Sequence, residues 1–363
     1  MNPLTLGALQ SYDPKPDRVL LRFTHGLLLL RAPFEGVIQI RVTYSGAFAP
    51  RRSWDIALDE QDRPLTLQAT ATDEGLIITA APLHVTVTRR DGCVSFADDD
   101  GRVFAQDIAP PVCEDAPSSP HEERSEACDA ESAAGTPETT SPRTAVRVRK
   151  AMAPDEVYYG FGQRIGLLDR RGRTLTNWTV DPSHGHNRGM DNLYQAHPVF
   201  LALRPTLAWG FFLHSTWFSR FDVGATHPDI LDALTVGSEC DYYILYGPTP
   251  DAVVEKLTRL TGRPALPPLW SLGFHQSRWG YDSADKVRDL ATTFRARGIP
   301  LDTIHLDVDY MRGYRDFTWD PDRFPDPPLS YMSCARTMCG WSRSSTPASR
   351  RIWAPVMTSP TTG

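Results

Sequence analysis

The alternation of apolar and polar residues between Arg18 and Ala109 predicts a series of short β-strands. The runs VIQIRV and HVTVT place apolar residues at alternating positions, which gives each strand one buried face. The segment Asp98-Asp99-Asp100-Gly101 separates two apolar runs, and Asp and Gly tolerate the positive φ of a hairpin turn. The pattern therefore predicts an antiparallel β-sandwich.

Residues 113–143 interrupt this pattern. The segment is rich in Ser, Pro and Glu and carries no aliphatic or aromatic side chain beyond Ala. It cannot bury enough apolar surface to offset the entropy lost on ordering. We expect a disordered acidic insert within the sandwich, because β patterning resumes at TAVRVRKAM.

Strand-like runs continue from Tyr158 to Tyr246, and then the period changes to that of a helix. Thr249 is a typical N-cap, Pro250 suits the first helical position, and Gly262 ends the pattern. The apolar positions at helical spacing are Val253, Val254, Leu257 and Leu260. Residues 1–262 are therefore predicted to form the sandwich domain, and Pro264 to Pro268 an interdomain joint.

A β-α-β unit follows the joint. The pattern predicts a buried strand over 269–279 and a second strand over 302–310. Between them, Ser283 is expected to cap a helix that ends at Gly298. The apolar stripe of this helix is Val287, Leu290, Ala291 and Phe294. Such a unit, over 263–328, is typical of the start of a parallel sheet or a (β/α)₈ barrel.

The composition of the chain limits the classes of binding partner that can be expected. The chain has 363 residues and a formal net charge of -6, which argues against a nucleic-acid partner. Its longest apolar run, Leu27 to Leu30, is too short to span a bilayer, so we expect no membrane partner. Nine Trp residues suit carbohydrate, because indole faces stack on sugar C–H groups. The sequence leaves homo-oligomer formation open.

The first 18 residues and the cysteines predict a cytoplasmic protein. Met1 to Arg18 contains no basic stretch followed by an apolar core, so no signal peptide is expected. The cysteines are scattered without the spacing of a disulfide framework. They are Cys93, Cys113, Cys128, Cys240, Cys334 and Cys339.

The ends of the two predicted barrel strands carry candidate chemistry. Alternation along 302–310 would place His305, Asp307 and Asp309 on one face, pointing into a barrel with carboxylates at the active-site end. A loop-capping or ion-pairing role for either Asp is the alternative. Arg278 and Trp279 end the first strand and offer hydrogen-bond donors and a stacking surface. The alternative for Trp279 is packing in the core.

The segments LGFHQSRWGYDSADKV and GIPLDTIHLDVDYMRGYRDFTWDPDRFPDP resemble the opening of the catalytic barrel of glycoside hydrolase family 31. This is the α-glucosidase and α-xylosidase family. YYGFGQRIGLLDRRGRTLTNWTVD, LYQAHPVFLAL and WGFFLHST resemble its N-terminal, galactose-mutarotase-like sandwich. The resemblance runs from about Tyr158 to Pro327 and implies retaining hydrolysis of terminal α-glucosidic bonds in oligosaccharides.

The resemblance also implies roles for single residues. Asp307 matches the acid that binds sugar hydroxyls in the -1 subsite, and Asp309 matches a structural acid. Trp279 and Arg278 match residues beside that pocket, and His305 stands where some members have Trp. The list of implied substrate-binding residues is completed by Asp181, which matches a sandwich-loop acid that reaches the leaving-group side. Thr179 stands where the family usually carries Asn.

The two catalytic acids of the family lie on later barrel strands, beyond the equivalent of Pro327. Residues 329–363 lose barrel periodicity, and we predict a change of reading frame there. A frame two nucleotides on permits, from Trp341, Val-Ala-Ile-Val-Asp-Pro-Gly-Ile-Lys, which resembles the third strand of the family. The sequence therefore predicts a chain without the catalytic acids and without activity.

Other functions remain as alternatives. The sandwich alone would serve as a non-catalytic carbohydrate-binding module. A longer product would also fit an α-xylosidase or lyase-type relative. His184, His186 and His197 are weak metal-ligand candidates, and the family needs no metal, so neither a metal nor another cofactor is expected.

Overall fold

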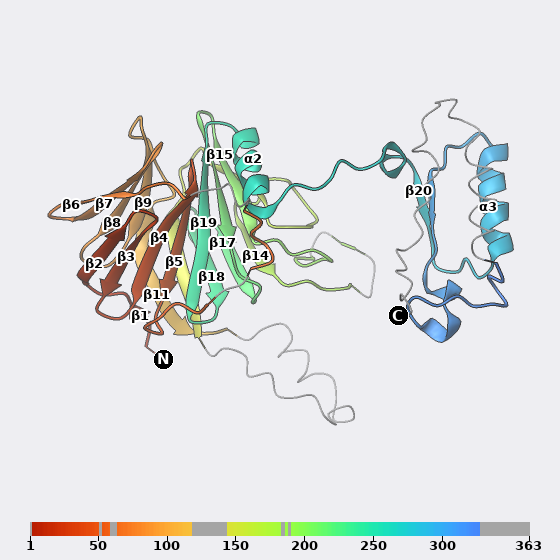
Figure 1. The fold of residues 1–363 in the computed structure, drawn as a ribbon, viewed down its shortest axis with the longest axis horizontal. Helices are drawn as coiled ribbons and strands as arrows, with labels where there is room; N and C mark the ends of the chain where they lie inside the picture. Colours follow the sequence, from red (N-terminus) through yellow and green to blue (C-terminus); the bar gives the residue numbers. More distant parts are fainter. Residues whose placement is uncertain are drawn as a thin grey trace, which may run out of the picture. The chain divides into compact units, whose positions relative to one another are not determined.

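The computed structural model describes residues 2–50, 53–58, 64–117, 144–182, 186–187 and 190–326. The chain divides into two compact units, Met1–Arg263 and Pro264–Gly363. The first unit is built from antiparallel sheets, as the alternating pattern predicts, and the second contains a β-α-β unit (Figure 1).

An eight-stranded antiparallel sheet forms one layer of the first unit. In spatial order its strands are β13 (Val157–Gly160), β15 (Val199–Arg204), β16 (Leu207–Leu213), β19 (Glu239–Gly247), β5 (Val37–Thr43), β4 (Leu27–Phe34), β3 (Arg18–Phe23) and β2 (Leu9–Lys15). Its centre joins strands that lie far apart in sequence, because β19 pairs with β5 in the register Tyr242↔Ile40.

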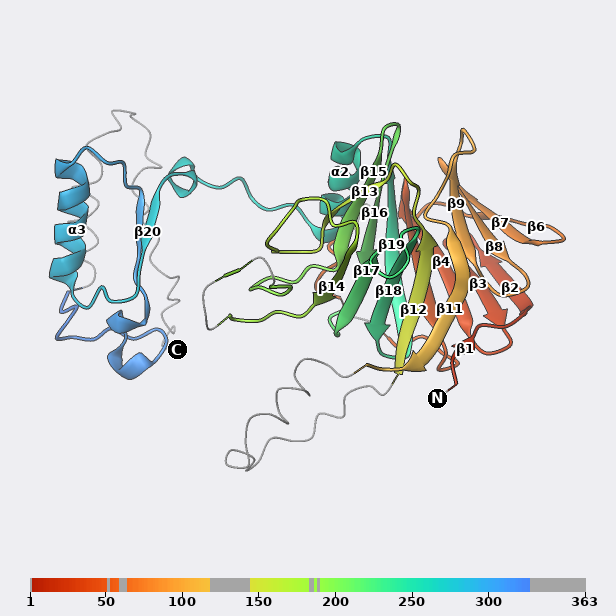
Figure 2. The ribbon, with the colours of Figure 1, turned by 180° about the vertical axis from the view of Figure 1, so that it is seen from behind.

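Two further antiparallel sheets complete the sandwich (Figure 2). The six-stranded sheet runs in the order β1 (Leu4–Thr5), β11 (Asp107–Asp115), β12 (Thr144–Ala151), β18 (Ile230–Val236), β17 (Ser219–Val223) and β14 (Arg173–Asn177). The five-stranded sheet runs in the order β10 (Val103–Phe104), β9 (Val94–Asp98), β8 (Leu83–Thr88), β7 (Gly75–Ala80) and β6 (Gln68–Ala71). The predicted hairpin at Asp98–Gly101 joins β9 to β10, and Gly101 has φ of 76°.

An aromatic cluster holds the eight-stranded and six-stranded sheets together. The rings of Phe200 and Phe211, from β15 and β16, stack with centroids 5.3 Å apart. Phe221 of β17 in the six-stranded sheet meets Phe200 edge-on at 6.0 Å. All three side chains are fully buried. Offset and edge-to-face ring pairs add to the hydrophobic gain of burying these large side chains.

Helix α2 (Pro250–Thr261) covers the outer face of the eight-stranded sheet, which explains why every residue of β16 is buried. Alternate residues of β16, such as Trp209, point into the core between the sheets. The others, such as Phe212, pack with Val253 and Leu260 of α2. Gly210 permits the close approach, since a Cβ there would lie 2.8 Å from the Val253 side chain.

The boundary expected for the acidic insert needs correction. Cys113 to Asp115 are the last residues of β11 and pair with β12 in the register Cys113↔Val146. Strand pairing satisfies their backbone groups, so composition alone placed the start of the insert too early. Residues 118–143 lie outside the described residues.

The second unit contains two short parallel strands joined through a helix. Strand β20 (His275–Ser277) pairs with β21 (Thr303–His305), and α3 (Ala284–Ala296) lies between them in sequence. Ser283 caps α3, as predicted, with its side chain accepting from the Lys286 backbone N–H. The parallel pairing is consistent with the start of a TIM barrel.

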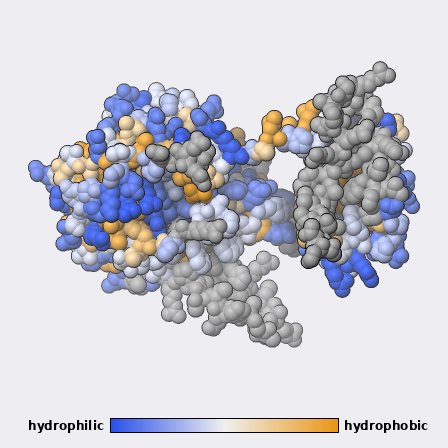
Figure 3. Space-filling model, viewed as in Figure 1, coloured by the Kyte–Doolittle hydropathy of each residue, from blue (hydrophilic) through white to orange (hydrophobic). Residues whose placement is uncertain are grey.

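Both strands of this unit are shorter than predicted. Residues Leu269–Leu272 form a 3₁₀ turn, η1, instead of a buried strand, and Val308–Tyr310 form another, η2. Apolar surface is exposed on the segment that leads from α2 into this unit (Figure 3); Leu266 is 95% exposed and Leu269 is 85% exposed. In the described ranges, no helix is long and apolar enough to cross a membrane.

Candidate functional site

Four of the predicted site residues gather at one end of the parallel strand pair. His305 is the last residue of β21 and lies opposite Ser277, the last residue of β20. Arg278 and Trp279 follow β20 directly, and Asp307 follows β21 by two residues. Because parallel strands end on the same side, these four residues share the carboxyl-terminal edge, where TIM-barrel enzymes place their active sites.

Asp307 is held by the backbone of a turn. It is the N-cap of η2, and its Oδ1 accepts a hydrogen bond of 2.7 Å from the Val308 N–H. The expectation that Asp307 and Asp309 continue a strand is therefore wrong: the chain turns at Asp307, and Asp309 lies inside the turn. The capping role weighed as an alternative is the one observed for Asp307, whose side chain is nevertheless exposed.

His305 belongs to a histidine pair that the sequence analysis missed. Its Nε2 lies 2.8 Å from Nδ1 of His275, and the two rings stack with centroids 5.1 Å apart. His275 Nε2 lies 3.2 Å from the Ser271 carbonyl oxygen, which only accepts. His275 therefore donates to Ser271 through Nε2, and the donor within the His275–His305 contact depends on the tautomers of the two rings. His275 and His305 lie in two strands that pair with each other. Their positions in these strands are the one sequence signal from which the contact could have been predicted.

Trp279 and Arg278 are available to a ligand. Trp279 is 72% exposed, so the core-packing alternative does not hold in the described part of the second unit. The Arg278 side chain is also exposed, and its Nε donates to the Trp279 carbonyl at 3.3 Å. An open indole beside a guanidinium is suited to stacking on, and donating to, a sugar.

Asp181 belongs to the first unit, on the loop that follows β14. Its side chain is exposed. The base of the loop is fixed by Arg164, which donates to the side chain of Asp191 and the backbone carbonyl of Thr176. The Val180 N–H donates to the Leu193 carbonyl at 3.0 Å and closes the loop further along.

The histidines weighed as metal ligands have other neighbours. His186 Nε2 lies 3.2 Å from the Tyr194 hydroxyl, and His197 Nε2 lies 3.3 Å from Gln195 Oε1. His184 lies outside the described residues. Where the structure describes the chain, no group of three or more His, Cys, Asp or Glu residues could hold a metal ion.

A hollow of about 910 Å³ opens in the first unit where the Asp181 loop begins. Its lining includes Trp54, Asn177, Trp178, His197, Trp217 and Ser219. The sequence analysis did not single out this set. Its members come from four separate segments, which the fold brings together, so no local sequence signal marks it.

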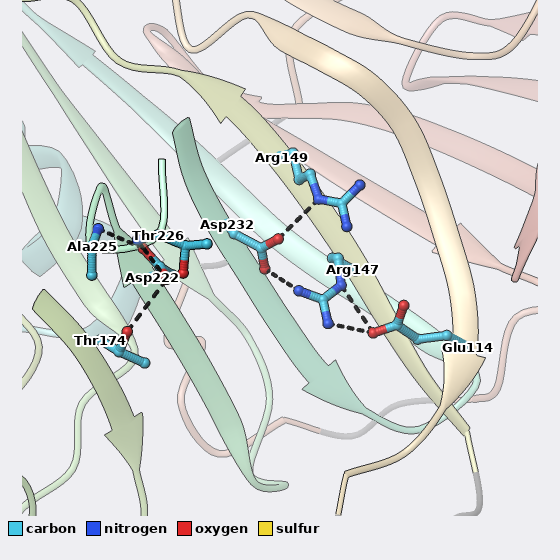
Figure 4. Close-up of polar contacts among 8 residues, drawn as sticks. All are labelled: Glu114, Arg147, Arg149, Thr174, Asp222, Ala225, Thr226 and Asp232. Atoms are coloured by element: carbon cyan, nitrogen blue, oxygen red, sulfur yellow. Dashed lines mark hydrogen bonds and ion pairs between the residues drawn. The ribbon is translucent and has the colours of Figure 1, made fainter. Parts of the chain in front are cut away.

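A second hollow, of about 550 Å³, lies on the outer face of the six-stranded sheet. Most of the charged side chains around it form ion pairs or hydrogen bonds with their neighbours (Figure 4). Asp232 accepts from Arg147 at 2.7 Å and from Arg149 at 2.9 Å. Partial burial alone would raise the pKa of the Asp222 carboxyl, but hydrogen bonds from Thr226, Ala225 and Thr174 lower it. We interpret this face as a network that stabilises the sheet.

Comparison with known families decides the affiliation. Residues 28–222 match the glycosyl hydrolase 31 N-terminal galactose mutarotase-like domain, which is more than half of the chain. The chain belongs to glycosyl hydrolase family 31. Residues 264–340 match the TIM-barrel domain of family 31. This match runs beyond Pro328, where the sequence predicts a break; residues 327–363 lie outside the described residues, and the change of frame stays a prediction.

Family 31 relatives include curated α-glucosidases. The chain is 46% identical over 177 residues to alpha-glucosidase 2 of Bacillus thermoamyloliquefaciens. The aligned region covers 49% of this chain and 22% of that protein. It is 34% identical over 182 residues to an alpha-glucosidase of Saccharolobus solfataricus. This alignment covers 50% of this chain and 26% of that protein. The matched region thus spans about a quarter of these relatives.

Solved structures of family 31 share the fold. A Flavobacterium johnsoniae GH31 dextranase, complexed with glucose, aligns with a TM-score of 0.75 at 22% identity, covering 92% of this chain and 38% of that one. A GH31 alpha-xylosidase from a soil metagenome, complexed with xylose, aligns with a TM-score of 0.69 at 16% identity, covering 91% and 46%.

Proposed function

We propose that the protein is part of an α-glucosidase of family 31, whose longer product acts by retaining hydrolysis on terminal α-glucosidic bonds of oligosaccharides. The observation that carries the proposal is the gathering of Arg278, Trp279, His305 and Asp307 at the carboxyl ends of two adjacent parallel strands. The 46% identity to an α-glucosidase supports glucose over xylose as the preferred sugar.

In this proposal, the residues of the chain bind the sugar and do not cleave it. The exposed Asp307 carboxylate accepts hydrogen bonds from sugar hydroxyls, and Trp279 provides an apolar wall for the ring. Arg278 and His305 supply donors beside them. For Asp181, which lies in the first unit, a role on the leaving-group side rests on the family resemblance alone. A retaining glycosidase also needs a nucleophile and an acid/base carboxylate about 5–5.5 Å apart, which the family places on later strands.

We further propose that residues 1–363 alone are inactive and that the reading frame changes near Pro328. Sequencing the gene across the codons for Phe324 to Gly340 tests the frame. We expect the purified 363-residue protein to release no nitrophenol from nitrophenyl α-glucoside above the buffer rate, because it lacks both acids. Turnover by this protein would refute the proposal of inactivity.

If the corrected frame encodes a longer product, that product tests the activity. We expect it to hydrolyse nitrophenyl α-glucoside faster than nitrophenyl α-xyloside. Asp307→Asn should lower kcat/KM roughly 100-fold, because hydrogen bonds to sugar hydroxyls strengthen in the transition state. Asp289→Asn, an exposed change on α3, is the matched control and should leave kcat/KM unchanged. Preference for the xyloside would favour the α-xylosidase alternative.

We also propose a cytoplasmic location. Among the described cysteines, Cys93 and Cys113 form no disulfide. Burial and the nearby Asp107 and Asp91 carboxylates raise the pKa of Cys93 to about 12, which keeps that thiol protonated and unreactive at neutral pH. Fractionation of cells that express a tagged protein tests the location.

A further inference from the structure

Two residues that line the hollow at the base of the Asp181 loop each carry a buried polar atom that has no hydrogen-bond partner among the described residues. They are Nδ2 of Asn177 and Oγ of Ser219. The side chains are 6% and 0% exposed, so water does not reach the two atoms, and a ligand reaches them only when the side chains around them move aside. Leaving a buried polar group unpaired is costly, and most buried polar groups in folded proteins have a partner. A ligand in the hollow would supply the missing bonds.

The two atoms are presented together by strand pairing. Asn177 ends β14 and lies directly opposite Ser219, which begins β17. Cross-strand partners project to the same face of a sheet, so both side chains reach the same hollow. Arg164 fixes the orientation of the Asn177 amide, because its Nη2 donates to Oδ1 at 3.3 Å. The Nδ2 donor is therefore the group left for a ligand.

Aromatic side chains form the walls of the same hollow. Trp217 is 53% exposed and Trp54 is 83% exposed, and Trp178 lines the hollow beside Asn177. The volume of about 910 Å³ lies within the range of small-molecule pockets, about 300–1,000 Å³. Open indole faces together with a few fixed polar groups are the recognition chemistry of a ring that has an apolar face and a polar rim.

We propose that this hollow binds a neutral pyranose unit of an α-linked glucan. The ring stacks on Trp217, and its hydroxyls bond to Asn177 Nδ2 and Ser219 Oγ. Asp181, assigned above to the family site, is not among the residues that line this hollow. The proposal does not rest on catalysis, since the whole site lies within the first unit.

Maltose binding to the full 363-residue protein, followed by calorimetry and by Trp fluorescence, tests the site. We expect saturable binding to the wild-type protein and no binding of mannitol, which has hydroxyls but no ring face. Ser219→Ala and Asn177→Asp should each raise Kd roughly fivefold, the effect of one lost hydrogen bond. Asn177→Asp keeps an acceptor for Arg164 and removes the Nδ2 donor, but it also adds a negative charge at a site that is 6% exposed, so thermal stability is measured alongside binding. Trp217→Ala should raise Kd about tenfold.

Tyr242→Phe is the matched control. Its hydroxyl is also buried and unpartnered, but the residue lies in the core away from the hollow. Both Ser219→Ala and Tyr242→Phe should leave thermal stability unchanged or raised, whereas only Ser219→Ala should weaken maltose binding.

Asp307→Asn separates the hollow from the family site. Maltose binding that survives this change but weakens in Ser219→Ala supports the proposal. The proposal is overturned if the wild-type protein shows no saturable maltose binding. It is also overturned if Ser219→Ala and Asn177→Asp bind maltose as the wild type does, or if Asp307→Asn alone abolishes binding. None of these outcomes bears on whether a longer product hydrolyses α-glucosides.

Discussion

Lys150 shows how one charged side chain can be fixed in the core of the sandwich. It is 1% exposed, and its Nζ donates to Asp107 Oδ1 at 2.7 Å and to the Ala105 carbonyl at 3.1 Å. The ammonium also lies over the rings of Phe96 and Tyr242, at 5.6 and 5.2 Å from their centroids. A buried charge needs such partners, because water no longer solvates it.

We predict that Lys150→Met lowers the free energy of unfolding by about 3–5 kcal/mol, because it leaves the Asp107 carboxylate buried without its counter-ion. Urea denaturation followed by circular dichroism measures the change. Adding Asp107→Asn should recover part of the loss, since the amide is neutral and still accepts from the Val94 N–H. A loss below about 1 kcal/mol in the single variant would contradict this account of the pair.

The sequence carries a clear sign of the inward position of Lys150 and little sign of its partner. Val146 and Val148 are buried, so alternation along β12 places Lys150 on the same inner side. The partner Asp107 is placed by the register of β11 against β12, which contains bulges. Alternation is a local property, whereas a bulged register is decided by the packing of both strands.

At the scale of elements, helices α2 and α3 were predicted well because their signals are local. Thr249 caps α2, with its side chain accepting from the Ala252 N–H at 3.3 Å, and Pro250 follows it. Ser283 does the same for α3. Cap residues act within one turn, so their effect can be read from a few neighbouring residues.

We predict that Thr249→Ala destabilises the first unit by about 1 kcal/mol, because it removes the cap of the helix that covers the eight-stranded sheet. Urea unfolding curves provide the measurement. Thr258→Ala is the matched control: Thr258 is a partly buried residue inside α2 that caps nothing, and Ala favours the helix interior. An equal loss in both variants would argue against a capping role for Thr249.

The barrel strands were predicted less well, because their lengths depend on neighbours in space. At the start of β20, Asp302 accepts a hydrogen bond from the Phe274 N–H at 2.9 Å. A Cβ on Gly273 would lie 2.1 Å from this carboxylate. At the end of β21, the Asp307 cap draws Val308–Tyr310 into a turn. These contacts cannot be predicted from the alternation of apolar and polar residues, so both strands were expected to be longer.

At the scale of the whole molecule, the two units differ in how much core they bury. The first unit contains a continuous core shared by its sheets. In the described part of the second unit, the buried apolar side chains are Tyr281, Ala284, Ala291 and Phe324. Large apolar residues such as Leu272 and Phe317 are 70% and 74% exposed. Hydrophobic burial is the main favourable term in folding, so we expect the described part of the second unit to have little stability of its own.

We predict that the units lose structure at different points. In hydrogen exchange, β5 and β19 of the first unit should exchange only by global opening, with a free energy of about 5–15 kcal/mol. Backbone amides of β20 and β21 should open at a cost near zero, since they form a two-stranded sheet with little covering. Equal protection of both pairs of strands would contradict the difference in core size.

The sequence by itself determined the class of fold, the two capped helices, the order of sandwich and barrel segments, and the family to which the chain belongs. These follow from periodicity, capping residues and consecutive motif positions, all of which act over short stretches. Tertiary structure alone decided the pairing of β19 with β5, the stacking of His275 on His305, and the hollow that joins Trp54, Asn177 and Trp217. These features unite segments far apart in the chain, and their positions depend on strand register and on packing between sheets.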